Sequence, residues 1–269
     1  MLQLNRILLP TDFSKASHDA ARHAMALAAR FHSELHVIHA LDLRTTGMIG
    51  LLDRELGSSL DAFLAEEMKP FRVTRTLLTG DPGHEIVKYA ERTGADLIVL
   101  PTHGFGPFRQ LLLGSVTAKV LHDADCPVWT GAHMELADDS PPPEFRRIAC
   151  AIDLSANSET LLIWAGEFAR AVNGSLSLIH VFPDVNEEWR ASMSSQGREH
   201  AARLLRRLGL EAPIAVEFGA VGPAIANGVR RSEADVLIIG RGAASGALGR
   251  LRSSSYATIR ESPCPVISV

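Results

Sequence analysis

Short apolar runs alternate along the chain with longer segments in which apolar residues recur at helical spacing. In the first half, runs typical of buried strands lie at residues 7–10, 35–40, 73–78, 96–100 and 126–130. Between these runs, helical patterns extend from Ser14 to Phe31, around Leu56–Leu64, from Pro82 to Arg92, and around Ser115–His122. This alternation predicts an α/β domain with a parallel, doubly wound, five-stranded sheet and right-handed crossovers.

The first helical segment has a clear start signal. The hydroxyl of Ser14 can cap it by accepting the otherwise unpaired amide hydrogens of the first turn. Apolar side chains recur on one face at the 3.6-residue period, at Ala20, Ala24, Leu27, Ala28 and Phe31. Because most of these residues are small, the helix is expected to lie close to the sheet.

The same landmarks occur twice in the same order. They lie 138 to 141 positions apart (147 − 6 = 141; 264 − 126 = 138). The matches pair Arg6–Ser14 with Arg147–Ser155, His39 with His180, Gly80–Gly83 with Gly219–Gly222, Ala95–Leu100 with Ala234–Ile239, and Cys126 with Cys264. Offsets that drift by only three residues over five landmarks indicate a duplication, so the chain is expected to hold two copies of one domain in tandem.

The joint between the copies is expected in the polar, proline-rich stretch that follows the first copy. Three consecutive prolines, at 141–143, cannot continue a helix or the interior of a sheet, and a polar Asp-Asp-Ser segment precedes them. A short extended linker is the natural interpretation. The predicted boundaries are therefore 1–131 for domain 1, 132–145 for the linker and 146–269 for domain 2.

Composition and charge argue against several classes of protein. Apolar residues make up 46% and charged residues 22% of the chain, as in soluble globular proteins. The net charge of −4 argues against a broad electrostatic contact with nucleic acid, which needs a basic face. No apolar stretch approaches the length of about 18 residues that a membrane span requires. The beginning of the chain lacks the pattern of a secretory signal and reads as the start of a buried strand.

The cysteines and histidines offer no strong metal or redox signal. Cys126, Cys150 and Cys264 are odd in number and lack zinc-site spacing, so packed reduced thiols and a cytoplasmic location are expected. The histidines of the first helical segment do not share the i, i+4 spacing of a helical metal pair, so we expect no metal site. Neither a catalytic triad signature nor a Walker loop is present, and we expect no catalytic residue.

Unusual residues follow the first and fourth strands, where a doubly wound sheet binds its ligands. Asp12 follows the first strand, and Asp153 repeats the position in the second copy. A carboxylate there can accept hydrogen bonds from ribose hydroxyls or from an adenine amino group. It can equally well organise the strand–helix turn, and the local segment does not decide between the two roles.

A glycine-containing loop follows the fourth strand. Gly104 and Gly106 lie in it, and Gly114-Ser115 opens the next helix. Glycine lets a phosphate approach the backbone, and a helix N-terminus offers free amide hydrogens and the positive end of its dipole. The alternative is that the glycines only serve a turn.

These residues resemble the signature of the universal stress protein family, which is a glycine, two residues, a glycine, nine residues, and then Gly-Ser or Gly-Thr. Gly104, the nine residues after it, Gly114 and Ser115 fit the second half of that signature. The segments PTDFS and LGSVTAKVLHDADCPV are also similar to the family, and the resemblance extends over both copies. It implies two tandem domains of the adenine nucleotide α-hydrolase-like fold, each with strand order 3-2-1-4-5.

In members of this family that bind ATP, the resemblance implies that adenine and ribose lie against the first-strand aspartate and the end of the second strand. The phosphates lie on the glycine loop and the Gly-Ser helix start. Carried over to this chain, the set is Pro10, Asp12, Ala40, His103, Gly104, Gly114, Ser115 and Val116. The weaker set in domain 2 is Asp153, Gly240, Gly242, Arg252 and Ser253.

The two copies depart from the signature in different ways. Pro101 stands where the first glycine belongs, and proline removes an amide hydrogen there. In the second copy Gly240 matches that glycine, but Arg252 aligns with Gly114. The guanidinium of Arg252 would either fill and neutralise the phosphate position, which we favour, or hold a phosphate in a bidentate contact.

The sequence therefore suggests a universal stress protein that binds ATP or another adenine nucleotide in domain 1, with or without Mg²⁺, and acts as a stress-response regulator or scaffold. One alternative is an interaction module that binds no nucleotide. Another is a slow ATPase, which would need carboxylates near the phosphates that neither glycine loop supplies. The resemblance also suggests that the two domains pair through their fifth strands, whose edges are open to pairing, while a homodimer remains an option. No contact with nucleic acid or membrane is expected.

Overall fold

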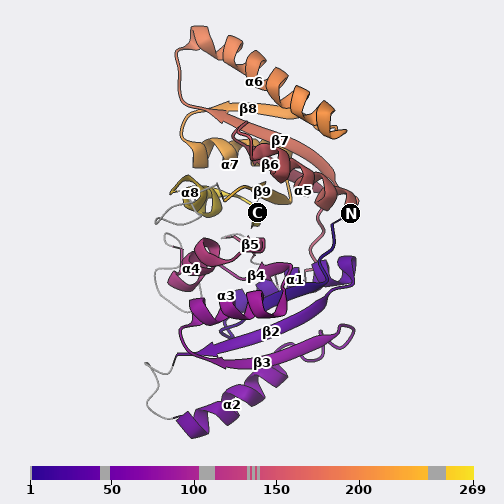
Figure 1. The fold of residues 1–269 in the computed structure, drawn as a ribbon, viewed down its shortest axis with the longest axis vertical. Coiled ribbons are helices and arrows are strands. Elements are labelled where there is room, and N and C mark those ends of the chain that lie inside the picture. Colours follow the sequence, from indigo (N-terminus) through magenta and orange to yellow (C-terminus); the bar gives the residue numbers. More distant parts are fainter. Residues whose placement is uncertain are drawn as a thin grey trace. The chain divides into compact units, whose positions relative to one another are not determined.

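The computed structural model describes residues 2–42, 49–102, 113–131, 134, 137, 140–241 and 253–269. Two compact units are present (Figure 1). The first is built from Gln3–Thr130 together with Met134–Pro143, and the second mainly from Glu144–Val269.

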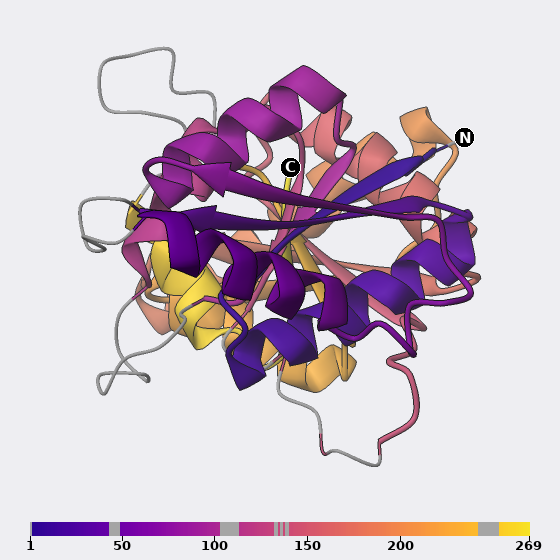
Figure 2. The same ribbon diagram turned by 90° about the horizontal axis from the view of Figure 1, so that it is seen from below.

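Strands and helices alternate throughout the first unit. Its elements are β1 (Arg6–Pro10), α1 (Lys15–Phe31), β2 (Glu34–Leu41), α2 (Ile49–Ala62), β3 (Val73–Thr79), α3 (Pro82–Thr93), β4 (Leu97–Val99), α4 (Ser115–Asp123) and β5 (Val128–Thr130). The strands are parallel and follow the order β3-β2-β1-β4-β5, so the predicted fold class and strand order are confirmed. In Figure 2, α1 and α2 cover one face of this sheet and α3 covers the other.

The second unit repeats this architecture. Its elements are β6 (Arg147–Ile152), α5 (Ser158–Ala171), β7 (Ser175–Phe182), α6 (Glu187–Leu208), β8 (Ile214–Phe218), α7 (Val221–Ser232), β9 (Val236–Ile239), α8 (Ser253–Glu261) and β10 (Val266–Ser268). The order of its parallel strands is β10-β9-β6-β7-β8, which is the order of the first unit read from the other edge.

The central strands form the core of each unit. In β1, the side chains of Ile7, Leu8 and Leu9 are fully buried, and in β9 Leu237 and Ile238 are as well. Helices on both faces leave no solvated side to a parallel sheet, which is why these strands are continuous apolar runs rather than alternating ones.

The ends of α1 follow the sequence signals. The Ser14 hydroxyl accepts a hydrogen bond from the amide of Ser17 at 3.2 Å, as predicted. His32 ends the helix in the left-handed conformation. The helix therefore begins directly after the turn that carries Asp12.

The end of α2 differs from the sequence expectation. The apolar pattern placed Phe63 and Leu64 on the helix, but α2 ends at Ala62. Leu64 has a φ of 46°, in the left-handed region that a regular α-helix of L-residues cannot contain. Phe63 is still buried, so the chain keeps the predicted apolar contact without the predicted helix.

The segment between the units is attached to α1. Arg22 donates through Nη1 to the carbonyl of Ala137 at 2.9 Å and through Nη2 to the carbonyl of Ser140. Nε2 of the buried His23 lies 3.3 Å from the carbonyl of Met134, whose side chain is also buried. The described part of residues 134–143 is thus an arm packed on the first unit. Of the helices in the described ranges, none is long and apolar enough to cross a membrane.

Candidate functional site

The first part of the candidate site is the turn between β1 and α1. Oδ1 of the half-buried Asp12 accepts a hydrogen bond from the amide of Ser14 at 3.0 Å and another from the hydroxyl of Ser17. The Ser17 hydroxyl oxygen also accepts from the amide of Asp12 at 3.2 Å. One oxygen of the carboxylate therefore helps to build the turn, and the side chain is held in a single orientation.

The residue after Asp12 is held in an uncommon backbone conformation. Phe13 has a φ of 64° although it is not glycine. Its amide donates to Oγ1 of the buried Thr11 at 3.0 Å, and its ring lies 4.7 Å from the His39 ring. Left-handed non-glycine residues cost about 1–3 kcal/mol and persist where surrounding contacts hold them, frequently at binding sites.

The second part of the site begins where β4 ends. The amide of Gly114 donates to the carbonyl of Thr102 at 2.8 Å, and Oγ1 of Thr117 donates to the carbonyl of Pro101 at 2.8 Å. These two bonds bring both ends of the glycine-containing segment together. Pro101 lacks an amide hydrogen, but its carbonyl is used to fix α4.

Helix α4 begins at a glycine. Gly114 is the N-cap residue, with φ −60° and ψ 147°, and it has no side chain with which to cap the first turn. In contrast, Ser14 caps α1 and Asp81 caps α3 with side-chain oxygens. Ser115 is exposed and Val116 is half-buried. The amides of a helix N-terminus and the positive end of its dipole suit an anion.

The two parts leave neighbouring strands at the same edge of the sheet. β1 and β4 are adjacent and parallel, with Ile7 beside Leu97 and Leu8 beside Ile98. Because β2 lies on the other side of β1 and the chain crosses to opposite faces there, this is the switch point of the sheet. Asp12 and Gly114 are thus brought to the edge where doubly wound folds bind ligands.

The remaining predicted residues of domain 1 divide into two groups. Pro10 is the buried last residue of β1, and Ala40 is half-buried near the end of β2, beside Leu78 of β3. Both lie at the same edge as Asp12. His103 and Gly104 lie outside the described residues.

The second unit repeats the first turn closely. Oδ1 of Asp153 accepts from the amide of Ser155 and from the hydroxyl of Ser158, each at 3.0 Å. Leu154 has a φ of 57° and matches Phe13. The shape of this turn is therefore preserved in both copies.

The second part of the site is not repeated in the same way. Gly240 is exposed after β9, and Arg241, aligned with Thr102, is buried with its amide bonded to the carbonyl of Val269 at 3.0 Å. Ser253 is the first residue of α8. Gly242 and Arg252 lie outside the described residues.

One residue of the site was missed by the sequence reasoning. Nδ1 of His39, near the end of β2, lies 2.8 Å from the carbonyl of Thr11, and His180 makes the same contact with Ile152 at 2.9 Å. The histidine pair was visible in the sequence as a landmark of the repeat. The repeat places each histidine at the end of a strand. It does not show that the histidine contacts the turn that follows the neighbouring strand.

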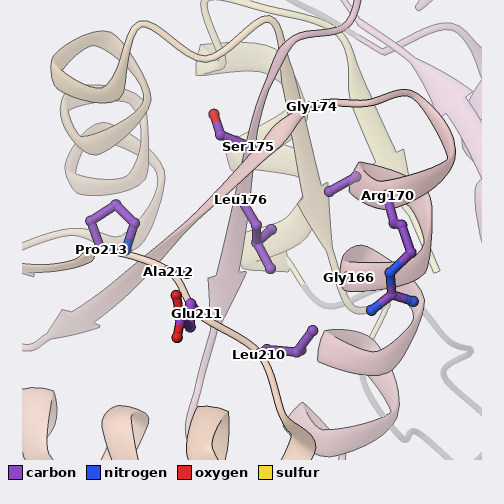
Figure 3. Close-up of a pocket in the computed structure, with 10 residues that line it drawn as sticks. Gly166, Arg170, Gly174, Ser175, Leu176, Leu210, Glu211, Ala212 and Pro213 are labelled. Carbon is purple, nitrogen blue, oxygen red and sulfur yellow. The ribbon is translucent and has the colours of Figure 1, made fainter.

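Two grooves are lined by described residues. One lies away from the candidate site, and the other reaches only Phe13 of it. A groove of about 610 Å³ in the second unit is lined by the end of α5, the start of β7 and the segment before β8 (Figure 3). It therefore lies at the amino ends of the strands, opposite the candidate site. A groove of about 490 Å³ in the first unit reaches Phe13 but is otherwise lined by α1 and by residues that follow α2.

Comparisons with known proteins agree with this architecture. The model of the universal stress protein family matches the chain twice, at residues 3–130 and 144–269. A universal stress protein of Methanocaldococcus jannaschii is 33% identical over 136 residues, which cover 46% of this chain and 79% of the relative. A second one from the same organism is 32% identical over 148 residues, covering 46% of this chain and 91% of the relative.

Among solved structures, a universal stress protein from Archaeoglobus fulgidus superimposes with a TM-score of 0.74 at 27% identity, covering 99% of this chain and 96% of its own. The strand order defines a tandem α/β protein of the doubly wound class. The Asp12 turn and the start of α4 lie at the edge of the sheet where this class binds ligands. The two matches of the family model together span nearly all of the sequence. The chain belongs to the universal stress protein family, as the sequence predicted.

Proposed function

We propose that the first unit binds an adenine nucleotide, with ATP as the first candidate, and that the chain acts as a nucleotide-dependent regulator or scaffold rather than a fast enzyme. The observation that carries this proposal is that the Asp12 turn and the glycine at the start of α4 lie at the switch point of one sheet. A carboxylate suits ribose hydroxyls, and the amides of a helix start suit phosphates. The cytoplasm is the expected compartment.

Domain 2 is proposed to be the degenerate partner. It keeps the aspartate turn, but a buried arginine, Arg241, follows β9 where the first unit has Thr102. Arg252 aligns with Gly114, so in the sequence alignment a cation takes the place of the glycine at the helix start. Both arginines favour a phosphate position in domain 2 that is already occupied by positive charge and so does not bind nucleotide.

Calorimetry with ATP tests the assigned site. Gly114→Arg gives the first unit the residue of the second and should weaken ATP binding at least about tenfold, because the side chain occupies the approach to the helix amides. Gly57→Arg is the matched control. It adds the same side chain on α2, at a glycine outside the assigned set where a Cβ atom would meet nothing within 4 Å, so this variant should bind ATP as the wild type does. Equal binding by the Gly114→Arg variant, or none by the wild type, would refute the site.

A second candidate function is a ligand-free interaction module. One oxygen of Asp12 is already used within the turn, which favours a structural role for this carboxylate. Mass spectrometry of protein purified without added nucleotide separates the two functions. A retained adenine nucleotide excludes the ligand-free module, whereas empty protein that does not bind added ATP excludes the nucleotide site.

We also propose that the predicted domain boundaries, 1–131 and 146–269, delimit two domains that pair within the chain through their fifth strands. Within its own unit, each fifth strand lies at an edge of the sheet, β5 beside β4 and β10 beside β9. A strand at the edge of a sheet is a template for pairing with another strand. A crystal structure in which β5 and β10 lie apart would exclude this arrangement.

A further inference from the structure

A histidine from the neighbouring strand contacts the carbonyl that precedes the aspartate in both units. The distances from Nδ1 to this carbonyl oxygen are 2.8 Å for His39 and 2.9 Å for His180. A carbonyl oxygen can only accept, so Nδ1 must carry the hydrogen in both histidines. The tautomer is thereby fixed, and in the neutral ring Nε2 is the acceptor.

The same histidine also supports the strained residue of the first turn. The ring centroids of His39 and Phe13 lie 4.7 Å apart, and Phe13 is the residue with positive φ directly after Asp12. His39 therefore contacts the turn on both sides of Asp12, by a hydrogen bond before it and by a ring contact after it. The carboxylate lies between two points that the histidine holds.

The surroundings of the two histidines differ. His180 is 5% exposed, its ring lies 4.5 Å from that of Phe182, and its Nε2 is buried without a hydrogen-bond partner in the described part of the chain. Helix α6 closes over it at Gly197, where a Cβ atom would lie 2.8 Å from the Phe182 ring and 3.5 Å from that of His180. His39, in contrast, is only half-buried.

We propose that His39 is a positioning residue of the nucleotide site, which holds the Thr11–Phe13 turn so that Asp12 is presented to the ligand. This inference rests on the proposed nucleotide binding. It adds a residue that acts through Asp12 and not by contact with phosphate. In the second unit the equivalent histidine makes the same hydrogen bond but is buried.

Two substitutions separate positioning from simple loss of a side chain. His39→Ala removes both contacts with the turn and should weaken ATP binding about tenfold, the effect of one lost hydrogen bond to an ordered group. His39→Asn places an amide N–H close to the position of Nδ1 and should restore most of the affinity. His84→Ala, at an exposed histidine of the same unit, is the control and should bind ATP as the wild type does.

A double-mutant cycle tests whether His39 acts through Asp12. In an Asp12→Ala background, His39→Ala should cause no further loss of ATP affinity, because the group that it positions is gone. If the two losses multiply instead, or if His39→Ala alone changes nothing, the positioning role is wrong.

Amide hydrogen exchange measured without nucleotide keeps this test independent of the proposed function. The amides of Phe13 and Ser14 bond to Thr11 and Asp12, so they report directly on the turn. Their exchange should be faster in His39→Ala and return toward the wild-type rate in His39→Asn. Unchanged exchange would overturn the inference even if ATP binds. Faster exchange in a protein that binds no ATP would instead sustain the positioning role and refute the nucleotide site.

Discussion

In the first unit the turn after β1 is half-buried beside a half-buried histidine, whereas in the second unit the same histidine is closed in by Phe182 and α6. The hydrogen bonds within the two turns are nearly the same. The turn has therefore been preserved after the duplication, while the side chains around it have changed. A shared turn is evidence for a shared fold, and only the residues around it indicate which copy can hold a ligand.

The two units also differ in how the equivalent helices α3 and α7 pack on their sheets. In the first unit the hydroxyl of Tyr89 on α3 lies 3.0 Å from Nδ1 of the buried His36. The position that matches Tyr89 in the second unit is Gly228 on α7, where a Cβ atom would lie 2.9 Å from Ile179. One copy thus packs a polar pair between helix and sheet, and the other brings the helix into close contact with an aliphatic side chain.

Placing the tyrosine of the first unit at Gly228 of the second should have the largest effect on stability. Gly228→Tyr should lower the free energy of unfolding of the second unit by about 3 kcal/mol or more, because the ring has no space between α7 and Ile179. Denaturant unfolding combined with hydrogen exchange, resolved by unit, measures this loss. Gly228→Ala is the matched control. Its Cβ atom would meet three atoms of Ile179 at 2.9–3.1 Å. This crowding opposes the gain in helix propensity of about 1 kcal/mol, so the alanine variant should be far closer in stability to the wild type than the tyrosine variant is. A tyrosine variant as stable as the wild type would show that the helix can move and that the divergence is not one of packing.

Much of this architecture could be predicted from the sequence. The order of strands and helices follows from apolar periodicity, and the turn was identifiable because it recurs with Asp12 and Asp153 at one spacing. Two features could not be predicted. The apolar pattern continues past Ala62, so nothing local announced the left-handed Leu64 that ends α2. The contact between His39 and Thr11 joins two strands, and periodicity does not tell which neighbour a side chain reaches.

The arm that follows the first domain illustrates the same limit. Three prolines indicate a linker, because they exclude helix and sheet. They do not indicate where the polar backbone groups beside them find partners. Those partners are on α1, at Arg22 and His23, which match the apolar residues Ile163 and Trp164 of α5 in the second unit.

Lowering the pH should destabilise the first unit through His23, whereas the matching residue of the second unit, Trp164, should have no such effect. Burial lowers the pKa of His23 from 6.5 to about 4, whereas Trp164 cannot titrate. Below pH 6.5 the unfolded chain binds a proton that the folded first unit rejects, so stability falls as the pH falls and levels off near pH 4. The full loss is about 3 kcal/mol, from 1.36 kcal/mol for each pKa unit.

Unfolding of the first unit at pH 7 and pH 4, followed by hydrogen exchange, tests this expectation. His23→Leu keeps a buried side chain of similar volume and removes the titrating group, so the pH-dependent loss should shrink by about 3 kcal/mol. The variant should be somewhat less stable at pH 7, because the contact with the Met134 carbonyl is lost. An undiminished acid loss in the variant would assign the pH dependence to other groups, such as His36, whose pKa is also lowered by burial.

The smallest expected effect is local and concerns Arg22. Arg22→Ile gives α1 the residue of α5 and removes the guanidinium that bonds to Ala137 and Ser140. Proteolytic cleavage within residues 134–143 should become about tenfold faster, which corresponds to the loss of about 1.4 kcal/mol of local stability. Limited proteolysis with mass spectrometry of the fragments measures this, and global stability should change little. Arg22→Lys keeps the charge but not the planar fork, so its cleavage rate should lie between the two. If the isoleucine variant is cleaved no faster than the wild type, the arm is held by its buried Met134 and not by the arginine.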